Sequence, residues 1–392
     1  MRNTFLSFSL PSIGEEEVNE VVDTLRSGWI TTGPKVKRFE EEFATFVGSS
    51  AALVLNSGTG ALHVALATLG IGPGDAVITT PMTFCSTIHV IEQVGARPIL
   101  ADVEPDTLNI DPNKIEDTLQ LATCNLKQKV KALLPVHLYG HPCEMSAIMD
   151  IAKKYNLRVI EDGAHALPAK YKGRLIGTIG DLTAFSFYAT KNLTTGEGGM
   201  LTGASGLIEE ARIWSLHGMS RDAWIRYSSE GSWYYEVIRP GFKYNMPDIL
   251  AAIGIQQLQK LTQFQTRRKE IVSRYNEVFS GYEELQLPVK RPEVDHAWHL
   301  YVIRLNLGRL KISRNQFIEE LKKRNIGTSV HFIPIHLHPY YRDKYGYKPD
   351  DFPITYREYQ RIISLPIYPK MTDQDVKDVI EAVGQVIDRF HC

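Results

Sequence analysis

The chain has 392 residues, 43% hydrophobic and 23% charged, the composition of a globular protein with room for two or three domains. Its 44 lysines and arginines are balanced by 45 aspartates and glutamates, and the net charge of −1 argues against a nucleic-acid-binding or acidic-membrane-binding surface. The four cysteines are far apart, no apolar run approaches the roughly 20 residues of a membrane span, and the N-terminus lacks a secretory pattern, so we expect a cytoplasmic protein with reduced thiols.

Short apolar runs alternate with helical patterns through the first part of the chain. The expected strands are residues 51–58, 75–81, 97–103, 130–140, 157–164 and 182–189. The expected helices between them are residues 59–70, 85–95 and 146–156. This alternation predicts a largely parallel sheet that is covered by helices on both faces.

The pattern changes after about residue 250. Residues 247–279 form one long helical pattern, interrupted only by Gly254. The last elements expected are a strand over 296–306, a helix that starts at the N-cap residue Ser313, and a helix over 373–390. We therefore expect a smaller α+β domain, joined to the large α/β domain through the long helix.

A glycine-containing loop, "NSGTGALH", follows the first expected strand. Gly58 and Gly60 permit close backbone approach, and Thr59 is a candidate N-cap with a free hydroxyl. The start of a helix presents unpaired N–H groups and a positive dipole end, which suit a phosphate. An ordinary capped turn would have the same sequence.

Two acids end a buried strand in "VIEDGAHA". A carboxylate from Asp162 could keep a ring nitrogen protonated, since an anion beside a pyridinium favours the cation. A magnesium ligand and a helix cap are the alternatives for Asp162.

A single lysine, Lys191, follows the strand in "AFSFYATKNLTTGEGGM". Taken alone, it would be a solvated loop cation. A lysine that is rigidly held and can be neutral forms Schiff bases with aldehydes such as pyridoxal phosphate (PLP). The chain offers all four parts of a PLP site: a phosphate-binding "GTG" loop, Asp162 for the ring nitrogen, the aromatic residue Phe84 and Lys191.

Over nearly its whole length the sequence resembles the DegT/StrS-type sugar aminotransferases. The motifs that carry the resemblance are "SGWITTGPKVKRFEEEF", "NSGTGALHVAL", "PMTFCST", "VIEDGAHALPAKYKGRLIGTIGDLTAFSFYATKN", "GEGGML" and "GFKYNMPDILAAIG". The resemblance implies a PLP-dependent transferase of fold type I, the aspartate aminotransferase-like α/β fold. The implied division is a large PLP-binding domain over residues 1–256, with an N-terminal arm over about 1–14, and a small domain over 257–392.

The resemblance also implies roles for residues around the cofactor. Lys191 matches the Schiff-base lysine, Asp162 the partner of the pyridine nitrogen, and Phe84 the aromatic that stacks on the ring. His165 matches the polar residue near the ring hydroxyl.

A second set of matched positions binds the cofactor phosphate. Gly58, Thr59 and Ser186 belong to it. Family members share their active sites across a homodimer, and the partner contributes residues from a G-Y-N-Y-R-M pattern. Here the pattern reads "GFKYNM", so Lys243 stands in place of the asparagine and Asn245 in place of the arginine.

The implied reaction is transfer of the amino group of L-glutamate to a nucleotide-linked ketosugar, with release of 2-oxoglutarate. The product would serve polysaccharide or lipopolysaccharide synthesis. His331 and Tyr188 are the expected substrate-binding residues. The motifs "GWITTGPK" and "HGMSRDAW" indicate the subgroup that makes UDP-4-amino-4-deoxy-L-arabinose, in which Tyr188 is replaced by histidine.

Three alternatives remain at this stage. The acceptor could be another UDP-, dTDP- or GDP-linked keto sugar, aminated at carbon 4 or carbon 3. The chain could be a regulatory protein that retains the fold. It could also be a zinc hydrolase using His331, His336 and His338, although their spacing lacks the H-E-x-x-H pattern and Pro334 and Pro339 break any helix there; we expect no metal.

Overall fold

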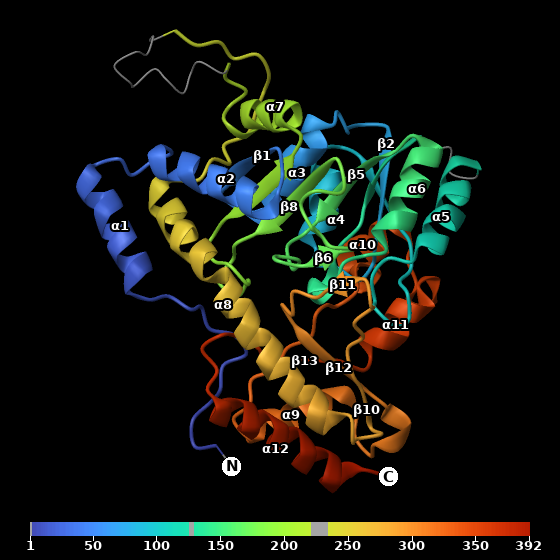
Figure 1. Cartoon of the computed structure of the whole chain (residues 1–392). Helices are drawn as coiled ribbons and strands as arrows, with labels where there is room; N and C mark the ends of the chain where they lie inside the picture. The colour runs from blue at the N-terminus through green and yellow to red at the C-terminus, as the bar shows by residue number, and fades with distance from the viewer. Residues whose placement is uncertain (1, 125–128, 221–233) are drawn as a thin grey trace.

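The computed structural model describes residues 2–124, 129–220 and 234–392. Figure 1 shows a large upper part, built around one sheet, and a smaller lower part that contains the C-terminal helices. One long helix, α8 (Asp248–Phe279), runs from the upper part to the lower. None of the described helices has the length and apolarity that a membrane span requires.

A seven-stranded sheet forms the centre of the large part. Its strands in spatial order are β1 (Ala51–Leu55), β9 (Gly199–Gly203), β8 (Leu182–Ser186), β5 (Arg158–Asp162), β4 (Lys129–Leu134), β2 (Asp75–Thr79) and β3 (Arg97–Leu100). From β8 to β3 every neighbouring pair is parallel, whereas β9 is antiparallel to both β8 and β1. The prediction of a largely parallel sheet is confirmed.

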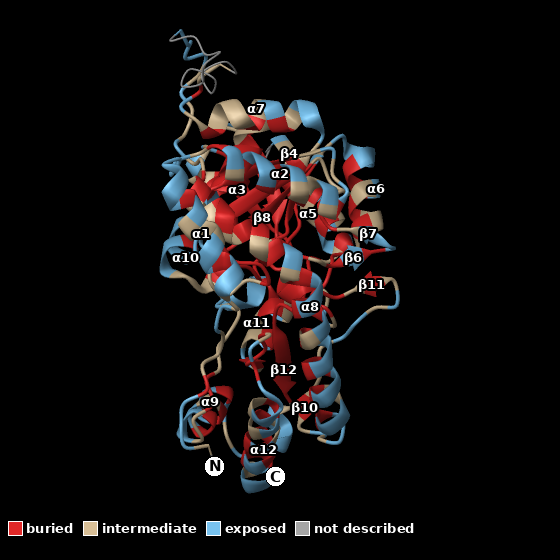
Figure 2. Ribbon diagram, turned by 60° about the vertical axis from the view of Figure 1, so that its left-hand side comes forward, coloured by how far each residue is buried: buried red, intermediate tan, exposed pale blue. Residues whose placement is uncertain are grey.

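Helices pack on both faces of this sheet, as the alternating pattern predicted. One apolar core includes side chains of α3 (Gly58–Thr68), α4 (Ser86–Gln93) and α7 (Ser205–Ser215). A separate core includes side chains of α2 (Pro34–Val47), α5 (Pro112–Cys124), α6 (Met145–Tyr155) and the first part of α8. Figure 2 shows the sheet buried between them, with the outer faces of the helices exposed.

The smaller part has a core of its own. Its sheet has the order β10 (Leu285–Gln286), β12 (Tyr301–Leu305), β13 (Ile362–Leu365). The helices that pack against it are α9 (Arg314–Lys323), α12 (Asp373–Phe390) and the second part of α8. Ser313 caps α9 through a hydrogen bond from the Gln316 N–H, which confirms the predicted helix start.

The remaining elements lie outside these two sheets. A small sheet joins β11 (Val294–Asp295), β6 (Lys170–Tyr171) and β7 (Arg174–Leu175). The other helices are α1 (Glu15–Ser27), α10 (Pro339–Tyr345), α11 (Pro353–Tyr359) and the 3-10 turns Leu138–Gly140, Leu307–Arg309, Ile335–Leu337 and Pro349–Asp351. The N-terminal arm pairs with the small part through Leu6 and Ile326. The division between residues 256 and 257 falls inside the continuous helix α8 and remains a prediction.

Every expected strand is shorter in the structure, and the difference is largest for two of them. The strand expected over 130–140 ends at Leu134, because Pro135 has no N–H and Tyr139 has a positive φ of 60°. The strand expected over 296–306 begins at Tyr301. Before it, the N–H groups of Ala297 and Leu300 donate to the carbonyls of Gly140 and Tyr139, so this segment pairs with a turn and not with a strand.

Candidate active site

A cavity of about 480 Å³ opens at the carboxyl ends of the parallel strands. The loops that follow β1, β2, β4, β5 and β8 all contribute to its wall. The small part contributes His299, Leu300, His331, Phe332 and Ile367, and the N-terminal arm contributes Phe8 and Ser9. Ligands of open α/β sheets bind at this edge.

Lys191 lines the cavity in the turn after β8. Its backbone N–H donates to the Tyr188 carbonyl at 2.9 Å, which fixes the turn. Burial lowers the pKa of the Lys191 amine to about 8, against the opposing effect of the Asp162 charge. Among the described residues, no hydrogen bond or ion pair engages Nζ. Roughly one tenth of the amine is therefore neutral at pH 7, and a neutral amine is a nucleophile and a base.

Asp162 ends β5 and also lines the cavity. Its Oδ2 accepts a hydrogen bond from Thr87 Oγ1 at 2.8 Å, and its Oδ1 accepts one from the Ala164 N–H at 3.1 Å. Thr83 Oγ1 lies 2.8 Å from Thr87 Oγ1 and is the donor there, because the Thr87 proton is used on the carboxylate. Burial raises the pKa of Asp162, while these bonds and the Lys191 charge oppose the rise. Asp162 thus does cap a turn, yet its carboxylate still faces the cavity.

The neighbouring acid, Glu161, points to the other side of the strand. Its Oε2 accepts from His137 Nε2 at 2.9 Å, and its Oε1 accepts from the Gly180 N–H and from Thr183 Oγ1, each at 2.8 Å. His137 Nδ1 accepts from the Cys143 N–H at 3.0 Å, so the neutral ring carries its proton on Nε2. Burial acts to raise the pKa of Glu161, but the bond from His137 and the other donors lower it. Glu161 is therefore structural.

The start of α3 faces the cavity beside Ser186. The predicted cap, Thr59, was wrong: the helix begins at Gly58, and Ser57 Oγ accepts the Gly60 N–H at 3.0 Å. Thr59 lies inside the first turn with its side chain exposed, and it lines the cavity with Gly58. A Cβ on Gly58 would lie 2.9 Å from Ser186 Cβ, so the helix start and the serine are in contact. Unpaired N–H groups and a hydroxyl thus meet at one end of the cavity.

Two histidines lie against each other on the opposite wall, with ring centroids of His165 and His299 4.4 Å apart. His165 Nδ1 accepts from the Tyr139 N–H at 3.2 Å, which leaves the proton of the neutral ring on Nε2. His299 Nδ1 lies 3.1 Å from Asn192 Oδ1 and donates to it, because the Asn192 amide group donates to the Leu167 and Ala297 carbonyls. Burial lowers the pKa of both rings, so both are neutral.

The other expected side chains around the cavity are aromatic or belong to the small part. Phe84 and Tyr188 line the cavity, with 56% and 48% of their surface exposed. His331 Nδ1 lies 2.8 Å from Ser364 Oγ, and the Phe8 ring stacks on His331 at 5.4 Å. Burial and, to a lesser degree, the charge of Lys191 lower the pKa of His331 to about 4.

The histidines of the zinc alternative do not converge. His336 is buried against Phe352, with ring centroids 4.9 Å apart, whereas His338 Nε2 lies 3.2 Å from the Ile333 carbonyl. No group of three metal-ligating side chains occurs within the described parts of the chain.

Lys243 and Asn245 are the two expected residues that do not line this cavity. Lys243 Nζ donates to Asn245 Oδ1, and Asn245 Nδ2 donates to Thr32 Oγ1 at 2.6 Å. Asn245 pairs with Leu55 at the end of β1, directly before the loop that leads into α3. Of the motif "HGMSRDAW", residues 221–224 lie outside the described residues.

Among the contributors to the site that sequence reasoning missed are Thr87, His299 and Phe8. Thr87 was expected only as part of a helix, and His299 only as part of an alternating strand. Phe8 reaches the cavity because the N-terminal arm crosses the small part, and no local pattern signals that path.

The residues present fit PLP. An amine of lowered pKa, a buried carboxylate, an exposed aromatic ring and a helix start beside a serine surround one cavity. These are the groups needed for its aldehyde, ring nitrogen, ring face and phosphate.

Comparison with known proteins identifies relatives along the whole chain. A model of the DegT/DnrJ/EryC1/StrS aminotransferase family matches residues 11–384. The chain is 53% identical over 388 residues to the spore coat polysaccharide biosynthesis protein SpsC of Bacillus subtilis, and the match covers 98% of each. The PLP form of Spr1654 from Streptococcus pneumoniae is 35% identical, with a TM-score of 0.90 over 98% of this chain and 99% of its own. Helicobacter pylori PseC, an aminotransferase of pseudoaminic acid biosynthesis, is 26% identical, with a TM-score of 0.89 over 99% of this chain and 100% of its own.

Proposed function

The chain belongs to the DegT/DnrJ/EryC1/StrS aminotransferase family and is a PLP-dependent aminotransferase of fold type I, and on that basis we propose its two substrates. The donor is L-glutamate. The acceptor is a nucleotide-linked ketosugar, and the preferred candidate is a UDP-linked 4-keto-pentose or 4-keto-hexose. The observation that carries the proposal is the placement of Lys191 and Asp162 on one cavity that also has room beyond them. Similarity to a polysaccharide biosynthesis protein and to PseC supports a sugar acceptor.

The residues of this chain have distinct tasks in the proposed reaction. When bound, PLP supplies an aldehyde that combines with amines and a protonated ring that stabilises negative charge on the adjacent carbon. When PLP is bound, the Lys191 amine would hold its aldehyde carbon; the nitrogen of glutamate would then take that place, and the freed amine would be the base that removes the Cα proton of glutamate. Asp162 keeps the ring nitrogen protonated by charge pairing. Gly58, Thr59 and Ser186 hold the phosphate, so the cofactor stays bound between the two half-reactions.

The acceptor contacts come from the cavity mouth and the small part. Tyr188 and His331 are the proposed sugar-nucleotide contacts, and the Nε2 proton of His165 is the proposed donor to the cofactor hydroxyl. Phe84 covers the ring. In the second half-reaction Lys191 returns a proton to the sugar carbon that receives the amine, and the aminosugar leaves.

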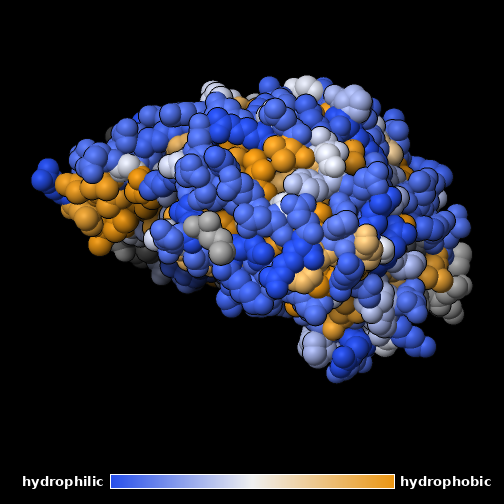
Figure 3. Space-filling model, turned by 90° about the horizontal axis from the view of Figure 1, so that it is seen from below, coloured by the Kyte–Doolittle hydropathy of each residue, from blue (hydrophilic) through white to orange (hydrophobic). Residues whose placement is uncertain are grey.

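A homodimer would complete the phosphate site. Lys243 and Asn245 lie beside their own helix start without lining their own cavity, which supports a role in the partner's site. Lys243 Nζ has two N–H donors beyond its bond to Asn245, and we propose it as the cation that reaches the phosphate. Figure 3 shows apolar side chains at one end of a mostly hydrophilic face and in further patches near its middle. Leu25 and Ile30 are among the exposed apolar residues, at 53% and 52%.

A panel assay tests the substrate proposal. The holoenzyme is incubated with glutamate and UDP-, dTDP- or GDP-linked 4-keto and 3-keto sugars, and 2-oxoglutarate and the aminosugar are measured. We expect turnover of a UDP-linked 4-keto sugar. If only a dTDP-linked, GDP-linked or 3-keto sugar were aminated, that sugar would replace the proposed acceptor. If no sugar nucleotide were aminated while free keto acids were accepted, the proposal would be refuted.

Capture of PLP by the apoenzyme is expected to depend on pH through Lys191. With a pKa of about 8, in place of the ordinary 10.5, roughly one tenth of the amine is neutral at pH 7. Only the neutral amine attacks the aldehyde, so the capture rate should rise with pH up to about 8 and then level off. Stopped-flow absorbance of the bound cofactor measures it. A rate that still climbs tenfold per pH unit above pH 9 would mean that the amine is not perturbed.

A methyl group at Gly58 should weaken PLP binding. Because the new Cβ would lie 2.9 Å from Ser186 Cβ and 3.2 Å from Ser186 Cα, Gly58→Ala must push the serine and the helix start apart. Overpacking of this kind costs about 1–3 kcal/mol, and we expect a rise of about tenfold in the Kd of PLP. Gly206→Ala, in α7, is the matched control, since its Cβ would meet nothing within 4 Å. An unchanged Kd for Gly58→Ala would place the phosphate elsewhere.

A further inference from the structure

Tyr139 stands at the junction of the two parts of the molecule, directly behind the cavity wall. It lies in the turn Leu138–Gly140 with φ 60° and ψ −2°, a left-handed conformation that is unusual for a bulky residue. Only 6% of its surface is exposed. Strained backbone of this kind persists where the surroundings hold it, and it gathers at functional sites.

Three hydrogen bonds connect Tyr139 to three cavity-lining segments. Its N–H donates to His165 Nδ1 at 3.2 Å, and its carbonyl accepts from the Leu300 N–H at 3.2 Å. Its phenol donates to the main-chain carbonyl of His331. His165 belongs to the large part, whereas Leu300 and His331 belong to the small part. Tyr139 therefore ties His165 and His331 together across the junction.

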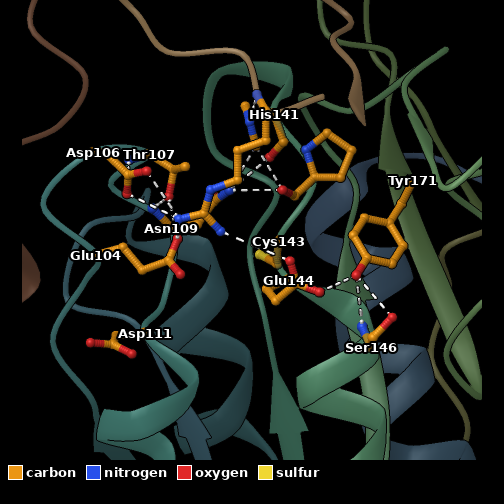
Figure 4. A network of polar contacts seen from close by, with 12 residues as sticks. Glu104, Asp106, Thr107, Asn109, Asp111, His141, Cys143, Glu144, Ser146 and Tyr171 are labelled. Atoms are coloured by element: carbon orange, nitrogen blue, oxygen red, sulfur yellow. Dashed lines mark hydrogen bonds and ion pairs between the residues drawn. The ribbon is translucent and has the colours of Figure 1, made fainter. Parts of the chain in front are cut away.

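The side chain of Asn109 holds the backbone of this turn through hydrogen bonds. Its Oδ1 accepts from the Leu138 N–H at 2.9 Å, and its Nδ2 donates to the carbonyls of His141 at 2.9 Å and Pro142 at 3.1 Å. Asn109 and His141 lie next to each other in Figure 4, within a larger polar network. The side chain of Asn109 thus fixes both ends of the turn that carries Tyr139.

We propose that Tyr139 is a positioning residue for the acceptor half-reaction, which rests on the proposed role of His331 in binding the ketosugar nucleotide. The phenol holds the His331 main chain at a set distance from His165, whose ring the Tyr139 N–H orients independently. Burial raises the pKa of the phenol, which therefore stays protonated and donates. Loss of the phenol should loosen His331 and leave His165 in place.

Tyr139→Phe separates these two functions, because it removes the phenol and keeps the ring and the N–H. We expect the KM for the ketosugar nucleotide to rise about three- to tenfold, the worth of one hydrogen bond. The rate of the glutamate half-reaction in single turnover and the absorbance of the bound cofactor should stay at the wild-type values. Tyr341→Phe is the matched control: Tyr341 is also buried, its hydroxyl has no hydrogen-bond partner among the described residues, and we expect no change.

Hydrogen–deuterium exchange gives a readout that needs no substrate. In Tyr139→Phe, peptides covering residues 329–333 should exchange several-fold faster, while peptides covering 162–166 stay as in the wild type.

Asn109→Ala is the second variant, and because it frees the turn it should also raise the Kd of PLP about threefold or more. For Tyr139→Phe, two results would overturn the assignment of Tyr139. One is an equal loss of rate in both half-reactions, and the other is an unchanged KM together with unchanged exchange at residues 329–333. Failure of the wild type on every ketosugar would instead overturn the proposed function, and the exchange data would still decide whether Tyr139 holds His331.

Discussion

Replacing Lys191 with alanine is expected to abolish transamination and to leave the fold intact. Loss of a positioned base alone lowers a rate by roughly 10²- to 10⁴-fold, and here the covalent hold on the cofactor is lost as well. The amine makes no hydrogen bond or ion pair among the described residues, and burial disfavours its charge more than the Asp162 charge favours it, so its removal should leave the apoenzyme folded. Absorbance of the purified protein, before and after addition of glutamate, measures the effect.

The wild type should be yellow with PLP and should lose the colour with glutamate, whereas Lys191→Ala should show neither behaviour. Borohydride reduction of the wild-type holoenzyme should fix the cofactor on the peptide that contains Lys191. Lys322→Ala, an exposed lysine of α9, is the control and should behave as the wild type. Residual turnover above a few per cent in Lys191→Ala would exclude the assigned role.

The positions that could be predicted from the sequence are those whose chemistry is local. Lys191, Asp162 and Gly58 each lie at or just after the carboxyl end of a strand that a short apolar run indicated, and parallel strands bring their carboxyl ends to one edge of a sheet. The fold could be predicted for the same reason, because the hydrophobic patterns that indicate helix α12 and the long helix α8 are set by the residues of those helices themselves. Strand periodicity alone places Glu161 and Asp162 on opposite faces without indicating which face holds the cavity, and the family resemblance is what assigns Asp162.

Features that depend on distant segments could not be predicted. The cap of α3 is Ser57 and not Thr59, two residues before the expected position, and this is by contrast a local difference, since Ser57 is itself a good capping residue. Phe8 and His299 reach the cavity only after the arm and the small part fold against the large part. The turn at Tyr139 replaces a predicted strand, because its backbone groups bond to His165 and Leu300, more than twenty residues away.

Asp162→Asn is expected to reduce turnover strongly without harming the apoenzyme. The amide has the shape of the carboxylate, its oxygen can still accept from the Ala164 N–H, and its Nδ2 can donate to Thr87 Oγ1. What disappears is the negative charge that pairs with the ring nitrogen. Breaking a buried charge pair costs about 3–5 kcal/mol, or roughly 10²- to 10⁴-fold in kcat. Steady-state kinetics with saturating PLP measures the loss.

Measurements of the stability of Asp162→Asn and Glu161→Gln provide the control for this prediction, because the two neighbouring carboxylates should behave in opposite ways. Burial raises the pKa of Asp162, so in the apoenzyme its charge opposes folding once the pH exceeds the unfolded pKa, and Asp162→Asn should not lower the thermal midpoint at pH 7. The pKa of Glu161 is lowered despite burial, so its charge stabilises the fold above the unfolded pKa, and this stabilisation is lost as the pH falls through the folded pKa. Glu161→Gln should therefore lower the free energy of unfolding at pH 7 by about 1.5–3 kcal/mol, the value of hydrogen bonds to a charged group, while the folded variant keeps kcat near the wild-type value. If Glu161→Gln lost turnover while Asp162→Asn lost only stability, the roles of the two acids would be exchanged.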